Sequence, residues 1–142
     1  MAHLNIIKLC VGAESIEDLT DWHLSHAHLW APGTTEHITR MWPRRAAELL
    51  DGGSLYWVIK GVVLVRQRLL GLEPRQGADG IQRCALVLDT EVVRTEAAPR
   101  RPFQGWRYLD PAESPRDLAK TRDREVALPP ALAQALAEIG LR

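Results

Sequence analysis

The 142-residue sequence lacks most of the signatures by which an enzyme or a metalloprotein is recognised. It contains no glycine-rich phosphate loop, no Gly-x-Ser-x-Gly nucleophile elbow and no cysteines or histidines at zinc-binding spacing. Its two cysteines, Cys10 and Cys84, are far apart and each is flanked by apolar residues. This predicts free, buried thiols in a reducing cytoplasm. We therefore expect neither a metal nor a cofactor.

Long hydrophobic runs are also missing. No apolar stretch approaches the roughly 20 residues that a membrane-spanning helix needs. The apolar segment near the N-terminus contains Asn5 and Lys8, and no basic region precedes it, so we predict no signal peptide and no membrane partner. The length and the 46% of hydrophobic residues suit one globular domain, residues 1–142, in the cytoplasm.

Aromatic residues are few, with one Phe and two Tyr, but there are five Trp. The net charge is zero and unevenly spread, because residues 1–39 carry one basic residue against five acidic ones, whereas residues 40–107 carry twelve against seven. Fifteen of the eighteen basic residues are Arg, the side chain that forks onto phosphates and stacks on flat rings. The middle of the chain is therefore a candidate positive face.

Hydrophobic periodicity and turn residues predict the order of the elements. Ser15 followed by Asp18 is typical of a helix start, and Pro43 and Gly52 bound a second, short helix. Lys60 and Gly61 indicate a tight connection between strands. We predict strands over residues 4–11, 54–59, 62–74 and 81–95, the last possibly divided in two, and a closing helix from Pro130 to Gly140.

Adjacent strands without helices between them favour an antiparallel or mixed sheet. The fold class is therefore expected to be α+β. Its centre would be a small curled mixed β-sheet or a partly open barrel, with two to four short helices.

Two stretches resemble the PUA-like (EVE- and ASCH-type) domains: "IIKLCVGAESIEDL" and "RRAAELLDGGSLYWVIKGVVLVRQRLLGLEP". The likeness covers roughly residues 4–88. Lys8 and Trp57 are the nearest matches to that family's lysine and aromatic positions, and Gly71 matches its strand glycine. The resemblance implies a PUA-like barrel that binds RNA or a flipped-out modified base.

The whole chain also resembles a family of alphaproteobacterial proteins that is known only as a domain of unknown function. The stretches "HITRMWPRRAAELLDGGSLYWVIKG" and "RRPFQGWRYL" carry this likeness. It implies no activity.

One constellation combines basic and aromatic residues, as nucleic-acid-binding surfaces do. Cations neutralise phosphates, and flat rings stack on unpaired bases. We predict binding of RNA, a nucleotide or a modified base by a surface that comprises Arg40, Arg44, Arg45, Trp57, Lys60, Arg66, Arg68, Arg100, Arg101, Gln104, Trp106, Arg107 and Tyr108. The alternative is that some rings belong to the core and that some arginines are merely solvated or paired with nearby acids.

Within this surface the segment at residues 99–109 has the most specific predicted roles. Arg100, Arg101 and Arg107 would contact phosphates, and Gln104 would pair with a base edge. Either Trp106 or Tyr108 would stack on the base. Phe103 would pin the segment to the core, and Arg44, Arg45, Arg66 and Arg68 would extend the positive surface.

Histidines provide two further hypotheses. His37 lies close in sequence to Arg40, Arg44 and Arg45, as a general acid/base with a phosphate clamp would, so an enzyme acting on a phosphate ester is an alternative function. The imidazoles of His23, His26 and His28 are possible metal ligands, but helical spacing brings only His23 and His26 to one face of the helix.

A third alternative is an interaction protein, perhaps a homo-oligomer, with exposed Trp at its interface. The sequence leaves both catalysis and oligomeric state open.

Overall fold

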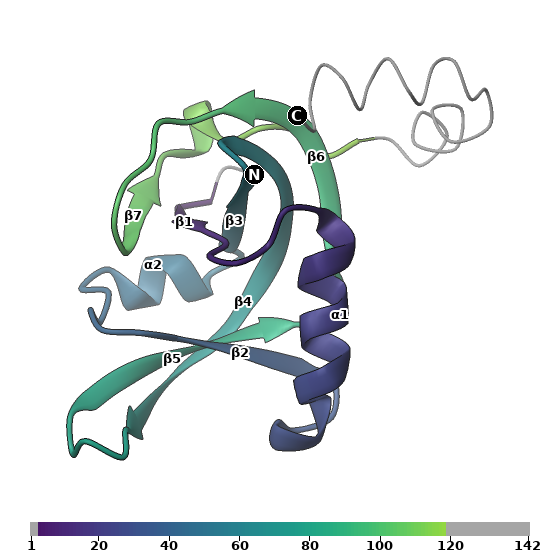
Figure 1. Cartoon of the computed structure of the whole chain (residues 1–142). Coiled ribbons are helices and arrows are strands. Elements are labelled where there is room, and N and C mark those ends of the chain that lie inside the picture. Colours follow the sequence, from purple (N-terminus) through teal and green to yellow (C-terminus); the bar gives the residue numbers. More distant parts are fainter. Residues whose placement is uncertain (1–2, 119–142) are drawn as a thin grey trace.

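The computed structural model describes residues 3–118. Its elements follow the chain as a strand, two helical segments, a strand, a short helix and then five strands (Figure 1). Their bounds are β1 (Asn5–Leu9), α1 (Ile16–His26), the 3-10 helix η1 (Ala27–Leu29), β2 (Thr34–Thr39), α2 (Ala46–Leu50), β3 (Ser54–Ile59), β4 (Val62–Gln76), β5 (Gln82–Asp89), β6 (Val93–Pro99), β7 (Trp106–Leu109) and the 3-10 helix η2 (Pro111–Glu113).

The strands form one mixed sheet in the order β2-β5-β4-β3-β1-β7, with β6 paired to β4 outside this path. The pairing of β1 with β3 is parallel and the other pairings are antiparallel. The predicted α+β class and mixed sheet are confirmed. The sheet is open and not curled, however, so the predicted small curled sheet or partly open barrel is wrong for the described residues. The helix predicted from Pro130 to Gly140 lies outside the described residues.

β4 is the long strand that organises the sheet. Its first half pairs with β3 on one side and with β6 on the other, and its second half pairs with β5. Figure 1 shows it as one bent ribbon that joins the region of β3 to the β5 hairpin. The β3–β4 turn has positive φ at both Lys60 (52°) and Gly61 (81°), as a two-residue type I′ hairpin requires, and this confirms the predicted tight connection.

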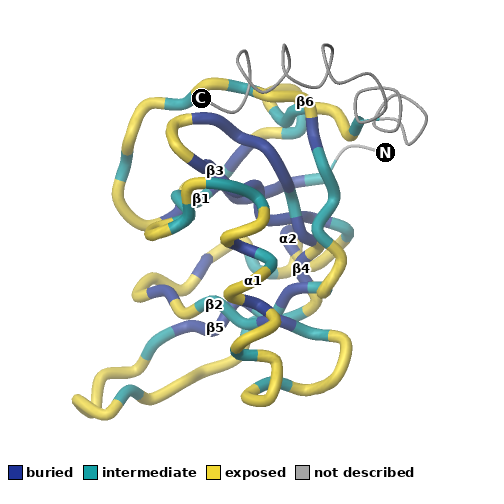
Figure 2. The backbone as a smooth tube through the Cα atoms, turned by 45° about the vertical axis from the view of Figure 1, so that its right-hand side comes forward, coloured by how far each residue is buried: buried dark blue, intermediate teal, exposed yellow. Residues whose placement is uncertain are grey.

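The core occupies both faces of the sheet. All six residues of β3 are buried, and because neighbours along a strand point to opposite faces, they contribute to two clusters. Leu55 and Trp57 belong to the larger cluster and Tyr56 and Val58 to the smaller one. Phe103 packs against the smaller cluster, as predicted for the ring that pins its loop. Figure 2 shows the buried residues following β3 and β4, while the outer end of the β4–β5 hairpin is exposed.

Local sequence signals explain where α1 begins. The Ser15 hydroxyl accepts a hydrogen bond from the Asp18 amide at 3.1 Å, and the Asp18 carboxylate accepts from the Glu14 amide at 2.8 Å. Both bonds satisfy amide groups at the start of the helix that would otherwise lack partners. The helix buries Leu19 and His23 against the sheet, which directs one of its histidines inward.

One predicted boundary shifts, and one alternative that the sequence left open is decided. The second helix begins at Ala46 rather than beside Pro43, because the chain turns once more before the helix forms. The apolar stretch at residues 81–95 divides into β5 and the start of β6, because the Asp89 carboxylate accepts a hydrogen bond from the Glu91 amide at 3.0 Å and turns the chain. β6 can therefore pair with the half of β4 that β5 leaves free.

Candidate functional site

A cavity of about 280 Å³ lies between β1, α1, β2 and β3. We call it the aromatic pocket. The side chains relevant to its chemistry are Lys8, Cys10, Trp22, His37 and Trp57. A ligand with one or two fused rings fits such a volume, because pockets for drug-sized molecules begin at about 300 Å³.

The parallel pairing of β1 with β3 builds the floor of the aromatic pocket. Lys8 stands opposite Trp57 in the register, so both side chains point to the same face of the sheet. β2 contributes His37, and α1 contributes Trp22. The site therefore depends on segments from four separate elements.

The walls of the pocket are flat rings. His37 lies with its ring centroid 4.4 Å from that of Trp57 and 4.8 Å from that of Trp22. Trp57 is only 1% exposed, whereas Trp22 is 40% exposed. An incoming ring would therefore meet Trp22 at the mouth and the edge of a fixed aromatic cluster inside.

His37 is bonded to a second histidine. Its Nε2 lies 2.9 Å from Nε2 of His23, which is buried at 7% exposure. Burial lowers the pKa of His23 to about 4, and burial together with the nearby His23 and Lys8 lowers the pKa of His37 to about 3. Both imidazoles are therefore neutral at pH 7, and each has one protonated and one bare nitrogen.

Lys8 supplies the cation among the described lining residues. Burial lowers the pKa of its ammonium group, since a desolvated charge is disfavoured. Burial also raises the pKa of the Cys10 thiol to about 11, so Cys10 is a neutral thiol and a poor nucleophile at pH 7. The pocket thus presents one amine, one acidic residue (Asp18), a neutral imidazole and apolar rings, a set suited to binding a planar polar molecule.

A buried hydrogen-bond hub holds Trp57 in place. Its Nε1 donates to the side-chain oxygen of Gln67 at 2.8 Å, and the Gln67 amide nitrogen donates to the Asp89 carbonyl at 2.7 Å and to the Thr35 hydroxyl at 3.2 Å. Gln67 is 0% exposed. The hub ties β2, β3, β4 and the end of β5 together behind the aromatic pocket.

A larger and more open recess of about 1220 Å³ lies on the opposite face of the sheet. We call it the polar cleft. Arg66 pairs with Tyr56 and Arg68 pairs with Ser54 in the β3–β4 register. Tyr56 and Ser54 lie an odd number of positions from Trp57 along β3, so their side chains point to the opposite face of the sheet. Paired residues share a face, so these arginines point away from the aromatic pocket.

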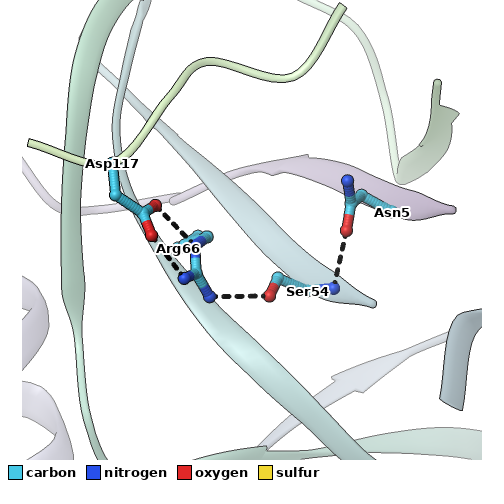
Figure 3. A network of polar contacts seen from close by, with 4 residues as sticks. All are labelled: Asn5, Ser54, Arg66 and Asp117. Atoms are coloured by element: carbon cyan, nitrogen blue, oxygen red, sulfur yellow. Dashed lines mark hydrogen bonds and ion pairs between the residues drawn. The ribbon is translucent and has the colours of Figure 1, made fainter. Parts of the chain in front are cut away.

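Within the polar cleft, the guanidinium of Arg66 already has hydrogen-bond partners in the protein (Figure 3). The guanidinium donates to both carboxylate oxygens of Asp117, at 2.7 and 2.6 Å, and to the Ser54 hydroxyl at 3.0 Å. The Ser54 amide donates to Asn5 Oδ1 at 2.8 Å. This network fastens the chain at Asp117 to β4 and leaves Arg66 fewer donors for a ligand.

Several other predicted binding residues also have partners within the protein. Arg45 pairs with Glu48 and lies over the ring of Tyr108, at 5.6 Å from its centroid. Arg107 lies 5.3 Å from the centroid of Phe103. These contacts place the two arginines on separate rings at the β7 edge of the sheet.

The 99–109 segment is divided between core and surface. Trp106 is buried at 9% exposure and its Nε1 donates to the Met41 carbonyl at 3.0 Å. Arg100 donates to the carbonyls of Pro99 and Glu113, and Gln104 is exposed.

The remaining predicted cations extend into solvent. Within residues 3–118, no hydrogen bond, ion pair or ring contact involves the side chains of Arg40, Arg44, Lys60, Arg68 and Arg101, all of which are exposed. The predicted basic residues are thus distributed over both faces and several edges of the sheet. Of the thirteen residues predicted to form the binding surface, Trp57 alone lines the aromatic pocket.

The structure gives His37 neighbours other than those expected from the sequence. Its contacts are with His23, Trp22 and Trp57, and none of its contacts in the described part of the chain is with the arginines that follow it. Sequence reasoning missed Trp22 as a site residue and considered His23 only as a possible metal ligand. The available signal was their helical spacing from Leu19, which predicts a shared face.

The histidine cluster at residues 23–28 does not converge on one point. His26 stacks on Trp22 at 4.3 Å between ring centroids and its Nδ1 lies 2.8 Å from the Trp22 carbonyl. The residues that the structure describes contain no group of three or more potential metal ligands. Nor is any helix among them long and apolar enough to cross a membrane.

Fold and site together define a class of α+β protein, with a mixed open sheet and an aromatic pocket at one side. Within that class the chain belongs to the family described as "Protein of unknown function (DUF1489)", whose family model matches residues 6–142. This confirms the resemblance to a family of unknown function. No curated protein and no solved structure matches the chain.

Proposed function

We propose that this protein binds a nucleotide-type ligand, either a free nucleotide or modified base or a base presented by RNA, with its ring in the aromatic pocket. The observation that carries the proposal is the meeting of Lys8, Trp22, His37 and Trp57 around one cavity of about 280 Å³. A purine or pyrimidine is flat, polar at its edges and of a size that this cavity accommodates.

Each part of the pocket matches one part of such a ligand. Trp22 is 40% exposed and would supply a ring for stacking, which is worth roughly 1–3 kcal/mol per base. Lys8 can donate to a ring carbonyl or a phosphate oxygen. His37, being neutral, can form a directional hydrogen bond to a ring edge without attracting anions indiscriminately.

The resemblance to PUA-like domains supports the same partner class. The matched lysine and aromatic positions, Lys8 and Trp57, lie 49 residues apart in the sequence, and both line the aromatic pocket. We therefore retain the PUA-like assignment as part of this proposal. Its implied ligand is RNA or a modified base.

The exposed Arg40 and Arg101, together with the half-buried Arg100, are the candidates for phosphate contacts. Arg40 directly follows β2, three residues beyond His37, and is exposed. An extended strand advances about 3.3 Å per residue, so Arg40 begins about 10 Å from His37 along the chain. In a longer RNA, Arg100 and Arg101 would add contacts farther along the backbone.

A titration with nucleotides and single-stranded RNA, followed by tryptophan fluorescence, tests the proposal. We expect Trp22→Ala to weaken binding roughly 5- to 100-fold, the loss of one stacked ring. The matched control is Trp42→Ala, because Trp42 is also partly exposed, at 46%, but lies outside the pocket lining. Circular dichroism checks that both variants fold. Equal affinities of the two variants would contradict the pocket as the site.

A salt series separates the pocket from the surface arginines. Replacing Arg100 and Arg101 together with Ala should flatten the dependence of log affinity on log salt for RNA by roughly 1–2 units, at about 0.7 per lost single-strand phosphate contact. Binding of a mononucleotide should be unchanged. An unaltered RNA slope would remove these two arginines from the interface.

The His23–His37 contact favours one second candidate function, acid–base catalysis on a phosphate ester with His37 as the acid or base. A hydrogen-bonded partner orients such an imidazole, and Lys8 lines the same pocket, where it could bind a phosphate oxygen. This candidate predicts that His37→Ala abolishes turnover in a screen of phosphate esters while the fold persists. Retained turnover would exclude His37 from the mechanism.

A further inference from the structure

The two histidines behind the aromatic pocket share one hydrogen bond, and this constrains their protons. Nε2 of His37 and Nε2 of His23 are 2.9 Å apart. A hydrogen bond between two imidazole nitrogens needs one protonated and one bare nitrogen. Since both rings are neutral, fixing the proton between them also fixes the state of the outer nitrogen of each ring.

Only two arrangements satisfy this contact. If His23 donates, His37 accepts at Nε2 and carries its own proton on Nδ1. If His37 donates, its Nδ1 is bare. Among the residues that the structure describes, Nδ1 of His37 has no hydrogen-bond partner, so it is the ring nitrogen left for an occupant of the pocket.

We infer that His23 is a positioning residue that lets His37 present either hydrogen-bonding polarity toward the ligand, so that the pair switches polarity to suit the ligand and broadens the specificity of the pocket. The inference rests on the proposed function. His23 does not line the pocket, so it acts through His37 alone. One arrangement presents an N–H to a ring carbonyl, and the other presents a bare nitrogen to a ring amino group.

The surroundings favour a switch over a fixed state. His37 is held by ring contacts to Trp22 and Trp57 and by its bond to His23. The ring contacts are not hydrogen bonds, and within residues 3–118 no hydrogen bond to Nδ1 of either histidine fixes one arrangement of the protons. Lys8 and Asp18 are the charged groups that line the pocket. Both rings stay neutral through the switch, because the proton that passes from one Nε2 to the other is matched at the outer nitrogens: solvent water takes a proton from Nδ1 of the ring that receives it and delivers one to Nδ1 of the ring that gives it up.

This predicts broad recognition of ligands that differ only in edge polarity. Uridine and cytidine monophosphate differ by a carbonyl or an amino group at the same ring position, and inosine and adenosine monophosphate form the equivalent purine pair. We expect the protein to bind the two members of a pair with affinities within about threefold. A rigid donor or acceptor would separate them by roughly three- to tenfold, the value of one net hydrogen bond.

Nuclear magnetic resonance of the nitrogen-labelled ligand-free protein tests the inference without any ligand. We expect the Nε2 signals of His23 and His37 to lie between the values for protonated and bare nitrogen, because the proton exchanges between the two rings. Signals fixed at the protonated value for one ring and the bare value for the other would overturn the switch.

The same spectra with the four nucleotides test the ligand response. A carbonyl ligand should protonate Nδ1 of His37, and its amino counterpart should leave that nitrogen bare, with the opposite change at His23. Binding seen at Trp22 with no change at His23 overturns the inference and leaves the proposed function standing. No binding of any nucleotide counts against the proposed function, and the ligand-free spectra then decide the inference.

Two nearly isosteric variants provide the matched comparison. The amide of His23→Gln can donate or accept, so the affinity ratio within a pair should stay within about threefold. The thioether of His23→Met only accepts, and weakly, so His37 keeps its proton on Nε2 and the ratio should move roughly three- to tenfold toward the amino ligand. Equal ratios in the two variants, with both folded by circular dichroism, would overturn a role for His23 in specificity.

Discussion

Gln67 offers the sharpest test of how the pocket is held together. The residue is 0% exposed and joins Trp57, Thr35 and Asp89 through three hydrogen bonds of 2.7–3.2 Å. Gln67→Leu keeps a similar volume but removes the amide. The indole N–H of Trp57 and the carbonyl of Asp89 then lose their partners behind the sheet.

The expected loss follows from those two groups. A buried donor or acceptor left unsatisfied costs about 1–3 kcal/mol, and leucine returns part of this through apolar burial. We therefore expect Gln67→Leu to lower the free energy of unfolding by about 2–4 kcal/mol. This is a large share of the roughly 5–15 kcal/mol that stabilises a domain.

Urea unfolding followed by circular dichroism measures this loss. The midpoint should fall while the slope with urea stays constant, since the exposed area is unchanged. Gln104→Leu is the control, because Gln104 is exposed and its replacement should change stability by less than about 0.5 kcal/mol. A loss at Gln67 no larger than at Gln104 would refute the hub.

Two further predictions concern stability. The pKa values of His23 (about 4) and His37 (about 3) lie below the 6.5 of a free histidine, so the unfolded chain binds protons that the folded one does not. The free energy of unfolding should be full above pH 6.5 and should fall toward pH 4 by up to about 1.4 kcal/mol per pH unit for each histidine. Urea unfolding of a variant with glutamine at both positions should show a flatter dependence on pH. An equal pH dependence in the two proteins would contradict the lowered pKa values of these histidines. Gly53→Ala should destabilise the fold by roughly 1–3 kcal/mol, because its Cβ would meet the backbone oxygens of Leu4 and Leu49. The Cβ of Gly71→Ala meets only an ordinary contact, so this variant should be nearly neutral. Thermal unfolding of both variants measures the difference, and equal losses would contradict the close approach at Gly53.

Features set by a few neighbouring residues were predictable from the sequence. The start of α1 depends on Ser15 and Asp18, and the β3–β4 turn depends on Lys60 and Gly61. In both cases one local hydrogen bond or one backbone conformation decides the structure. The split between β5 and β6 was equally local, but its signal was an aspartate turn without glycine or proline, which is harder to recognise.

The candidate site was only partly predictable because it depends on long-range packing. His23 and His37 meet only when α1 packs against β2, and no periodicity within either segment specifies that contact. The placement of Arg66 away from Trp57 depends on the β3–β4 register. Composition identifies the types of residue that bind nucleotides, but register decides which of them share a face.

The most direct test of the proposed pocket is to follow the five indole N–H resonances while a nucleotide is added. The account predicts that the signals of Trp22 and Trp57 move in a saturable way and that those of Trp42 and Trp106, which lie outside the pocket lining, stay in place. Movement of Trp106 with Trp22 and Trp57 unchanged would contradict it. The ligand would then lie at the arginine-rich segment beside β7.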